Sequence, residues 1–301
     1  MTTSKNIFFL VLLIAYSGQT LPNTPVVIWH GMGDSCCNPL SIGRIKSIIE
    51  SNISGIYVHS LKIGNNIEED TYNGFFKDVN EQIALVCDQL KNDTNLKNGY
   101  HAIGFSQGAQ FLRAVAQRCP YPPVRNLISI GGQHQGVYGF PRCPDSLSKI
   151  CDEIRSLLNI GAYEKFVQKI LVQAQYWHDP LNEKLYREKS LFLADINQEI
   201  IFNKEYRDNL LKIKNLVLVK FNKDSMVIPR ESEWFGFYKP GQSKEIYEME
   251  QSPLYLNDTL GLQTLDREGR LFRLTINSDH LKFSDEWFID NIVDSFLRDK
   301  I

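Results

Sequence analysis

One pentapeptide constrains the fold more than any other part of this 301-residue chain. Residues 104–108 read Gly-Phe-Ser-Gln-Gly, between an apolar run at 100–103 and a helix-compatible segment at 107–118. Two glycines let the backbone reverse so sharply between a strand and a helix that the serine hydroxyl stands clear of the sheet. The pattern predicts a nucleophile elbow with Ser106 as the nucleophile. An ordinary strand-to-helix turn is the alternative, because glycine and serine are common in loops.

Segments with the patterns of strands and helices alternate on both sides of this turn. Short apolar runs typical of buried strands occupy 26–29, 56–63, 100–105, 126–130, 215–221 and 271–276. Apolar residues recur at helical spacing in two further segments, 75–90 and 286–297. A repeated β-then-α order predicts a mostly parallel sheet with helices on both faces. Together with the elbow, this order predicts the α/β-hydrolase fold.

The alternation is interrupted between residues 137 and 212. This region has no strand pattern and contains helical stretches at 162–175 and 203–213. We expect an insertion that caps the sheet before its late strands, within a single domain that covers residues 18–301. Its apolar residues are expected to be mostly core, but they include candidates for an acyl groove. These candidates are Leu157, Leu158, Phe166, Ile170, Leu171, Tyr176 and Trp177.

The first 17 residues have the features of a secretory signal peptide. Lys5 precedes an apolar run at 7–16, and small residues stand at Ala15 and Ser17. About ten apolar residues are too few to span a bilayer, so we expect removal after about Ser17. A retained membrane anchor is the alternative. We expect no transmembrane segment in the mature chain, and a formal charge of −2 favours neither nucleic acid nor an anionic membrane as a partner.

Entry into an oxidising pathway makes disulfide bonds the default state of the six cysteines. These are Cys36, Cys37, Cys87, Cys119, Cys143 and Cys151. Three bridges are expected, and the residues alone leave all fifteen pairings open, although Cys143 and Cys151 are near enough to close a small loop. The sequence contains no Cys-x-x-Cys pair, the spacing that would suggest a zinc site. We expect no metal and no cofactor. Sequons at Asn52, Asn92 and Asn257 are glycosylation candidates.

A second glycine-rich loop follows the first predicted strand. Residues 30–34 read His-Gly-Met-Gly-Asp, and a loop of this kind supplies one oxyanion-hole N–H in α/β-hydrolases. We assign that N–H to Met32. The second donor is assigned to Gln107, the residue after the nucleophile. For His30 we favour a structural imidazole that holds the loop over direct catalysis.

The remaining catalytic residues are predicted from order and location. Enzymes of this fold carry Ser, then an acid, then His, with the acid and the base on loops after late strands. Asp224 follows the strand at 215–221, and His280 follows the last predicted strand. Asp179 precedes the late strands, and Asp279 is poorly aimed because it adjoins His280. We therefore predict the triad Ser106, Asp224 and His280.

The predicted triad implies acyl transfer to water. Ser106 becomes nucleophilic when His280 accepts its proton, while Asp224 orients the imidazole and stabilises its cation. The N–H groups of Met32 and Gln107 receive the oxyanion. Water then hydrolyses the acyl-enzyme. The triad by itself leaves the acyl donor open.

Several stretches beyond the triad resemble one family along nearly the whole chain. They are residues 30–34, 36–37, 104–108, 110–113, 130–136, 176–180, 193–197, 232–238 and 279–280. With nearly constant spacing from about residue 25 onward, they resemble the palmitoyl-protein thioesterases, the lysosomal type with long-chain preference. This resemblance is far more specific than the serine motif alone.

The resemblance implies an activity, a location and a set of site residues. It implies release of thioester-linked fatty acids such as palmitate from cysteines of S-acylated proteins or peptides in lysosomes. For the location we expect the secretory pathway and the lysosome, with secretion as the alternative destination. It places the triad and the oxyanion donors on the residues already named. It also implies bridges Cys36–Cys37, Cys87–Cys119 and Cys143–Cys151. The alternatives are a short-chain thioesterase, a lipase-like carboxylester hydrolase and, more remotely, an inactive binding protein.

The chemistry of a thioester suits an acidic compartment. A histidine of ordinary pKa, about 6.5, is only about 3% neutral near pH 5, so the general base is scarce. A thiol of pKa about 8.5 leaves readily as the thiolate and needs less protonation than an alkoxide or an amine. We therefore expect activity to rise from pH 5 toward neutrality.

Overall fold

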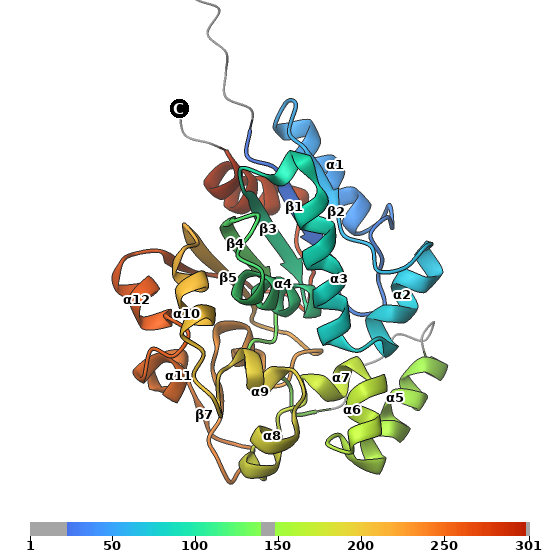
Figure 1. Cartoon of the computed structure of the whole chain (residues 1–301), viewed down its shortest axis with the longest axis vertical. Coiled ribbons are helices and arrows are strands. Elements are labelled where there is room, and N and C mark those ends of the chain that lie inside the picture. The colour runs from blue at the N-terminus through green and yellow to red at the C-terminus, as the bar shows by residue number, and fades with distance from the viewer. Residues whose placement is uncertain (1–22, 140–147, 299–301) are drawn as a thin grey trace, which may run out of the picture.

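The computed structural model describes residues 23–139 and 148–298, and its centre is a six-stranded parallel sheet (Figure 1). The strand order is β2-β1-β3-β4-β5-β8, and every neighbouring pair is parallel. The strands are β1 (Val26–Trp29), β2 (Val58–Ser60), β3 (Tyr100–Phe105), β4 (Val124–Ile130), β5 (Asn215–Phe221) and β8 (Leu271–Ile276). The chain runs from β1 to one edge and then returns to build the rest on the other side of β1. Such a reversal of strand order places ligand sites at the carboxyl ends of the strands.

Side chains of each inner strand alternate between two apolar layers, which is why helices cover both faces. Val27 and Trp29 of β1 enter one core, while Val26 and Ile28 enter the other. The first core is covered by α3 (Val79–Asn92), α4 (Gln107–Arg118) and α10 (Lys204–Leu211). The second is covered by α1 (Ile42–Asn52), α13 (Asp285–Phe288) and the π-helical η5 (Ile289–Leu297). The predicted α/β-hydrolase fold is confirmed.

Two of the predicted elements that differ in extent from the structure lie before β3. The apolar stripe at 75–90 belongs to two helices, α2 (Ile67–Phe76) and α3, because Lys77 is extended and the Asp78 side chain caps α3 by accepting from the Asn80 N–H. The expected strand at 56–63 pairs over three residues only. At its end the Ile63 N–H donates to the Asp70 carboxylate instead of to the sheet.

Helices fill the stretch between β4 and β5, and within its described residues no strand forms there. They are α5 (Ser148–Gly161), α6 (Lys165–Ile170), α7 (Val172–Gln175), α8 (Glu183–Lys189), α9 (Leu193–Ile196) and α10. Helices α5 to α9 lie together at the lower end of the view in Figure 1. The helix expected at 162–175 is divided at Leu171, whose backbone is extended. The boundaries of the insertion stay a prediction.

Short elements complete the region between β5 and β8. They are η3 (Arg230–Trp234), β6 (Phe237–Tyr238), β7 (Ile246–Tyr247), η4 (Met249–Gln251), α11 (Pro253–Leu256) and α12 (Leu262–Arg267). Strands β6 and β7 pair as a small antiparallel hairpin. The short turn η1 (Thr94–Leu96) lies earlier, between α3 and β3. Among the described helices, none has the length and apolar character needed to cross a bilayer.

Between cysteines that both lie in the described ranges, the structure has two disulfides, Cys36–Cys37 and Cys87–Cys119, in the pairings that the resemblance implies. Cys143 and the predicted signal peptide, residues 1–17, lie outside the described residues, so the third pairing and the signal peptide stay predictions. Asn92 and Asn257 are exposed at the ends of helices. Asn52 is half-buried, and its side-chain amide donates to the Ile48 carbonyl.

Candidate active site

The turn between β3 and α4 has the geometry of an elbow, and its two glycines have a steric reason. Ser106 sits at φ 52° and ψ −124°, in the left-handed range of φ, which non-glycine residues rarely adopt. A Cβ added at Gly104 would lie 2.2 Å from Ala109 Cα, and one at Gly108 would lie 2.4 Å from the His30 carbonyl oxygen. The motif therefore lets β3, α4 and the neighbouring His30 loop pack closely around one serine.

The structure brings the three predicted triad residues together. They come from the loops that follow β3, β5 and β8, at the same edge of the sheet. His280 Nε2 lies 3.0 Å from Ser106 Oγ, and His280 Nδ1 lies 2.5 Å from Asp224 Oδ2. In this arrangement Nδ1–H donates to the carboxylate, and Nε2 is directed to the hydroxyl proton.

The Asp224 carboxylate is held from several sides. Its side chain is fully buried, and Oδ1 accepts the N–H groups of Met226 and Val227 at 2.7 and 2.8 Å. Burial by itself raises the pKa of Asp224, but the hydrogen bonds and the charge of His280 lower it below its ordinary value. Asp224 is therefore a carboxylate that orients the imidazole.

Asp279, the rejected acid next to His280, and His178, another histidine of the chain, have other partners. Asp279 accepts from the backbone N–H and hydroxyl of Ser225 and from the backbone N–H of His280, not from its ring. His178 contacts the Gln135 carbonyl through Nδ1 and Glu183 through Nε2, and its ring stacks on aromatic neighbours. Neither residue completes a second triad with Ser106.

The predicted oxyanion donors flank the nucleophile. A Cβ added at Gly31 would lie 3.1 Å from Ser106 Cβ, so the loop that carries Met32 touches the serine. Gln107 is the first residue of α4, where the positive end of the helix dipole favours developing negative charge. Two hydrogen bonds fix the Gln107 side chain, which donates to the Gly74 carbonyl and accepts from Tyr176 Oη.

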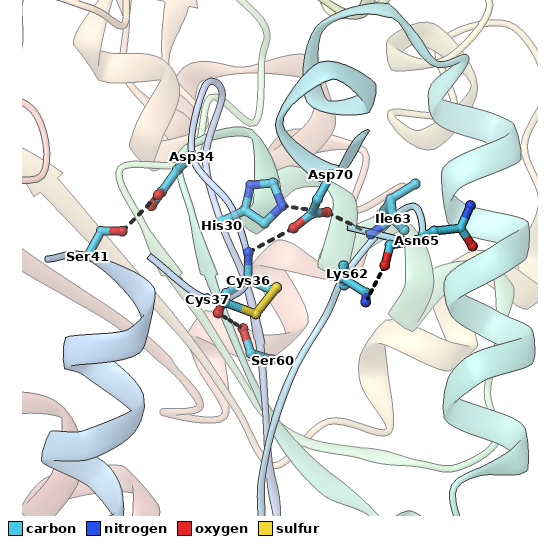
Figure 2. The surroundings of a disulfide bond; sticks show 10 residues. All are labelled: His30, Asp34, Cys36, Cys37, Ser41, Ser60, Lys62, Ile63, Asn65 and Asp70. Atoms are coloured by element: carbon cyan, nitrogen blue, oxygen red, sulfur yellow. Dashed lines mark hydrogen bonds and ion pairs between the residues drawn. A yellow bond between two sulfur atoms is a disulfide. The ribbon is translucent and has the colours of Figure 1, made fainter. Parts of the chain in front are cut away.

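A buried ion pair supports this loop from beneath (Figure 2). His30 Nε2 lies 3.2 Å from Asp70 Oδ1, and His30 Nδ1 lies 2.8 Å from the Gly31 carbonyl oxygen. Asp70 also accepts the backbone N–H groups of Cys36 and Ile63 at 2.8 and 2.7 Å. His30 thus holds the loop, as the sequence suggests. Asp70 was not identifiable from the sequence, because it lies in the acidic run 68–70, where exposed carboxylates are expected.

Burial and pairing act in opposite directions on this pair. Burial lowers the pKa of His30, but the hydrogen bond and charge of Asp70 and the bond to Gly31 raise it above its ordinary value. Burial likewise raises the pKa of Asp70, and His30 with two backbone N–H groups lowers it. Both nitrogens of His30 face acceptors, so these contacts favour the protonated ring, the imidazolium, beside the Asp70 carboxylate.

A large apolar cavity opens at Ser106 and His280. It measures about 1070 Å³, including the solvent at its mouth. Apolar side chains from both sides of the nucleophile line it: Met32, Leu40, Ile45, Val137, Leu158, Tyr176, Trp177, Met226, Val227 and Phe283. Pockets of this size and character bind small apolar ligands. The cavity offers room for an acyl chain beside the serine.

The acyl-groove candidates from the insertion divide into three groups. Leu158, Tyr176 and Trp177 line the cavity. Leu171 and Leu157 pack in a neighbouring apolar cluster, the former fully buried. Phe166 and Ile170 are exposed instead. Helical spacing alone does not distinguish these three environments.

The structure places a buried glutamate next to the triad, and the sequence pattern gave no sign of it. Glu233 on η3 is fully buried, and one oxygen or nitrogen from each of Glu233, Asp224 and His280 lies within 4.8 Å of the others. Three such groups are compatible with a metal ion, but both ring nitrogens of His280 already contact Asp224 and Ser106. We therefore interpret the cluster as a triad with an additional carboxyl group.

Comparison with known proteins agrees with this geometry. A family model described as palmitoyl protein thioesterase matches residues 25–280. Palmitoyl-protein thioesterase 1 of Caenorhabditis elegans is 53% identical over 90% of this chain and 91% of the relative. Palmitoyl-protein thioesterase 3 of Dictyostelium discoideum is 38% identical over 90% of each, and lysosomal thioesterase PPT2 of Mus musculus is 30% identical over 83% of this chain and 79% of the relative. The chain belongs to the palmitoyl protein thioesterase family.

Proposed function

We propose that the protein hydrolyses long-chain acyl thioesters, palmitate above all, on cysteines of S-acylated proteins or peptides. The observation that carries the proposal is the Ser106–His280–Asp224 array at the floor of an apolar cavity, in a chain of this family. A long acyl chain gains about 0.8 kcal/mol per buried methylene, so such a cavity favours long chains.

The reaction proceeds in two steps through an acyl-enzyme. Ser106 Oγ attacks the thioester carbonyl carbon while its proton passes to His280 Nε2, and Asp224 stabilises the resulting imidazolium. The N–H groups of Met32 and Gln107 stabilise the oxyanion. The C–S bond then breaks, and the thiolate takes the proton from His280. Water repeats the sequence on the acyl-serine and releases the fatty acid.

We further propose that the protein works in the lysosome and that some of it is secreted. The predicted signal peptide, the two disulfides and the exposed sequons at Asn92 and Asn257 support passage through the secretory pathway. Relatives carry the name lysosomal thioesterase. The substrates would then be S-acylated proteins and peptides delivered for degradation.

The deciding experiment replaces the nucleophile. Ser106→Ala is expected to lose thioester turnover by about 10⁵-fold or more, because the attacking group is removed. A serine-directed phosphonate should label the wild-type enzyme and not this variant. The matched control is Ser47→Ala, which changes an exposed serine on α1. Full turnover by the Ser106 variant would refute the proposal.

A comparison of substrates separates the proposed activity from its alternatives. We expect a higher kcat/KM on palmitoyl thioesters than on short-chain thioesters or on palmitoyl oxygen esters. The thiol leaves more readily than an alcohol, and the long chain fills the cavity. Preference for short chains would indicate a short-chain thioesterase, and preference for oxygen esters a lipase-like enzyme.

A further inference from the structure

Glu233 is placed behind the triad by a turn that is itself anchored. Ser232 Oγ donates to the Gly136 carbonyl, and Trp234 Nε1 donates to the Leu218 carbonyl of β5. Between these two residues the Glu233 side chain points into the protein and is fully buried. Its Oε2 accepts the N–H of Phe221, the last residue of β5, at 2.8 Å. Glu233 therefore joins the turn η3 to the strand end that carries Asp224.

The other oxygen of Glu233 has an unusual environment. Oε1 is buried and has no N–H or O–H donor among its described neighbours. An ionised carboxylate would leave this oxygen without a donor and would place a second negative charge within a few ångströms of Asp224. Two carboxyl groups in such a site share one proton rather than both ionising.

Burial and the neighbouring charges indicate which of the two residues keeps the proton. Asp224 has the imidazole and two backbone N–H groups as donors, and Glu233 has one. Burial, followed by the contact with Asp224, raises the pKa of Glu233 well above its ordinary value. The charged groups that face Glu233 are Asp224, His280 and Lys220. The charge of Lys220 lowers the pKa of Glu233, but its effect is smaller than those of burial and of Asp224.

We propose that Glu233 is a positioning residue whose protonated carboxyl group donates a hydrogen bond to the Asp224 carboxylate. This inference rests on the proposed role of the triad and adds a fourth member, in the order Glu233, Asp224, His280, Ser106. The neutral donor fixes the Asp224 carboxylate while leaving it charged. It also withdraws negative charge from Asp224, which makes the Asp224–His280 pair a weaker base.

This hydrogen bond has a consequence for the pH dependence of the reaction. A carboxylate that gives part of its charge to the Glu233 donor stabilises the imidazolium less strongly than a carboxylate without that donor. Loss of the Glu233 donor should therefore move the acidic side of the profile of kcat/KM against pH. Glu233 thus affects the acid limb, the range of low pH over which kcat/KM falls. It touches neither the substrate nor the reacting atoms.

Two variants at position 233 test the proposal through the pH dependence of kcat/KM. Glu233→Gln keeps a neutral donor for Asp224 and an acceptor for Phe221, so we expect kcat/KM within about threefold of wild type and an unchanged acid limb. Glu233→Leu removes the donor. We expect kcat/KM to fall about tenfold or more, with the acid limb moved to higher pH by about half a unit or more.

Two outcomes would overturn the proposal. If Glu233 were ionised, the Gln variant would remove a negative charge that favours the imidazolium, and its acid limb would move to lower pH. If Glu233 only filled space, the Leu variant would match the wild type in both rate and limb. Since Ser106→Ala tests the triad separately, either failure leaves the proposed function standing when that alanine variant is inactive.

A stability measurement supports the test in case the Leu variant does not fold. A group with a raised folded-state pKa binds its proton more tightly in the native state, so its contribution declines as pH rises above the unfolded value of about 4.5. The wild type should therefore lose unfolding free energy relative to Glu233→Gln between pH 5 and pH 8. Parallel curves would mean that Glu233 is not a buried acid and would overturn the proposal.

Discussion

The protein contains two aspartate–histidine pairs near the same serine, and they are used in different ways. Asp224–His280 lies at the cavity, with the second ring nitrogen 3.0 Å from Ser106 Oγ. Asp70–His30 lies next to the loop at residues 30–34, which is predicted to carry one oxyanion donor, with the second ring nitrogen on the Gly31 carbonyl. The first imidazole faces a hydroxyl that can give up a proton. The second faces only acceptors.

The difference shows that the pair alone does not define a catalytic histidine. Its role depends on what the other ring nitrogen meets and on access to the cavity. The His280 side chain is 12% exposed, whereas the side chains of His30 and Asp70 are 2% and 0% exposed. The buried pair therefore fixes a loop, and the cavity pair has the geometry of the proposed base with its orienting acid.

The largest expected difference between the two pairs is in kcat after each aspartate is replaced by asparagine. Asp224→Asn should lower kcat about 10⁴-fold, because an amide favours the wrong imidazole tautomer and cannot stabilise the imidazolium. The matched change Asp70→Asn should lower kcat by about tenfold or less, because Asp70 acts only through the loop. Steady-state turnover of a palmitoyl thioester measures both. Equal losses in the two variants would mean that the two aspartates do not differ in their roles.

Replacing the two histidines should reverse the ranking when stability is measured. His30→Ala is expected to lower the free energy of unfolding by about 3–5 kcal/mol, because it leaves the Asp70 carboxylate buried and without its cation. His280→Ala should cost less, since the His280 side chain is 12% exposed and lines the cavity, so that water can reach Asp224 when the ring is removed. Urea unfolding followed by circular dichroism gives both values. A native-like stability for His30→Ala would contradict the structural role of the pair.

The buried pair should also give stability a defined pH window. The lowered pKa of Asp70 contributes stability above about 3.8 that is lost as pH falls, and the raised pKa of His30 contributes stability below about 6.5 that is lost as pH rises. The wild type should exceed Asp70→Asn by the most between these values, on the order of 2 kcal/mol. Thermal unfolding of both proteins from pH 3 to pH 9 measures the window. A difference that is constant across this range would argue against an ion pair.

The smallest expected effect is the loss of stability when one hydrogen bond near each aspartate–histidine pair is removed. Ser60→Ala removes the bond from Ser60 Oγ to the Cys36 carbonyl beside the buried pair and should cost about 1 kcal/mol of stability. Ser225→Ala, the matched change near the triad, removes the bond to Asp279. We expect the two variants to lose similar amounts of stability. Only Ser225→Ala should change KM or kcat measurably, because its partner Asp279 adjoins His280. Chemical denaturation and steady-state kinetics distinguish them.

The sequence predicted the elements that repeat a local pattern or a fixed chain order. The strand cores and α4 follow from apolar runs, and Ser106, Asp224 and His280 follow from the motif and the order of the fold. The break at Lys77 and Asp78 was missed, because the apolar spacing continues across it. Asp70 and Glu233 were missed for a different reason: carboxylates are common on surfaces, and only burial among specific donors separates these two from the others.

The Cys87–Cys119 bridge spans 32 positions, and the segment between its ends contains β3, the elbow and the whole of α4. The nucleophile therefore lies inside a covalent ring. A protease that cut the backbone once within this ring would leave two fragments joined by the disulfide. The fragment that carries Ser106 would therefore stay covalently linked to the other one. Such tethering gives an enzyme resistance to separation after nicking, which matters most where proteases are abundant.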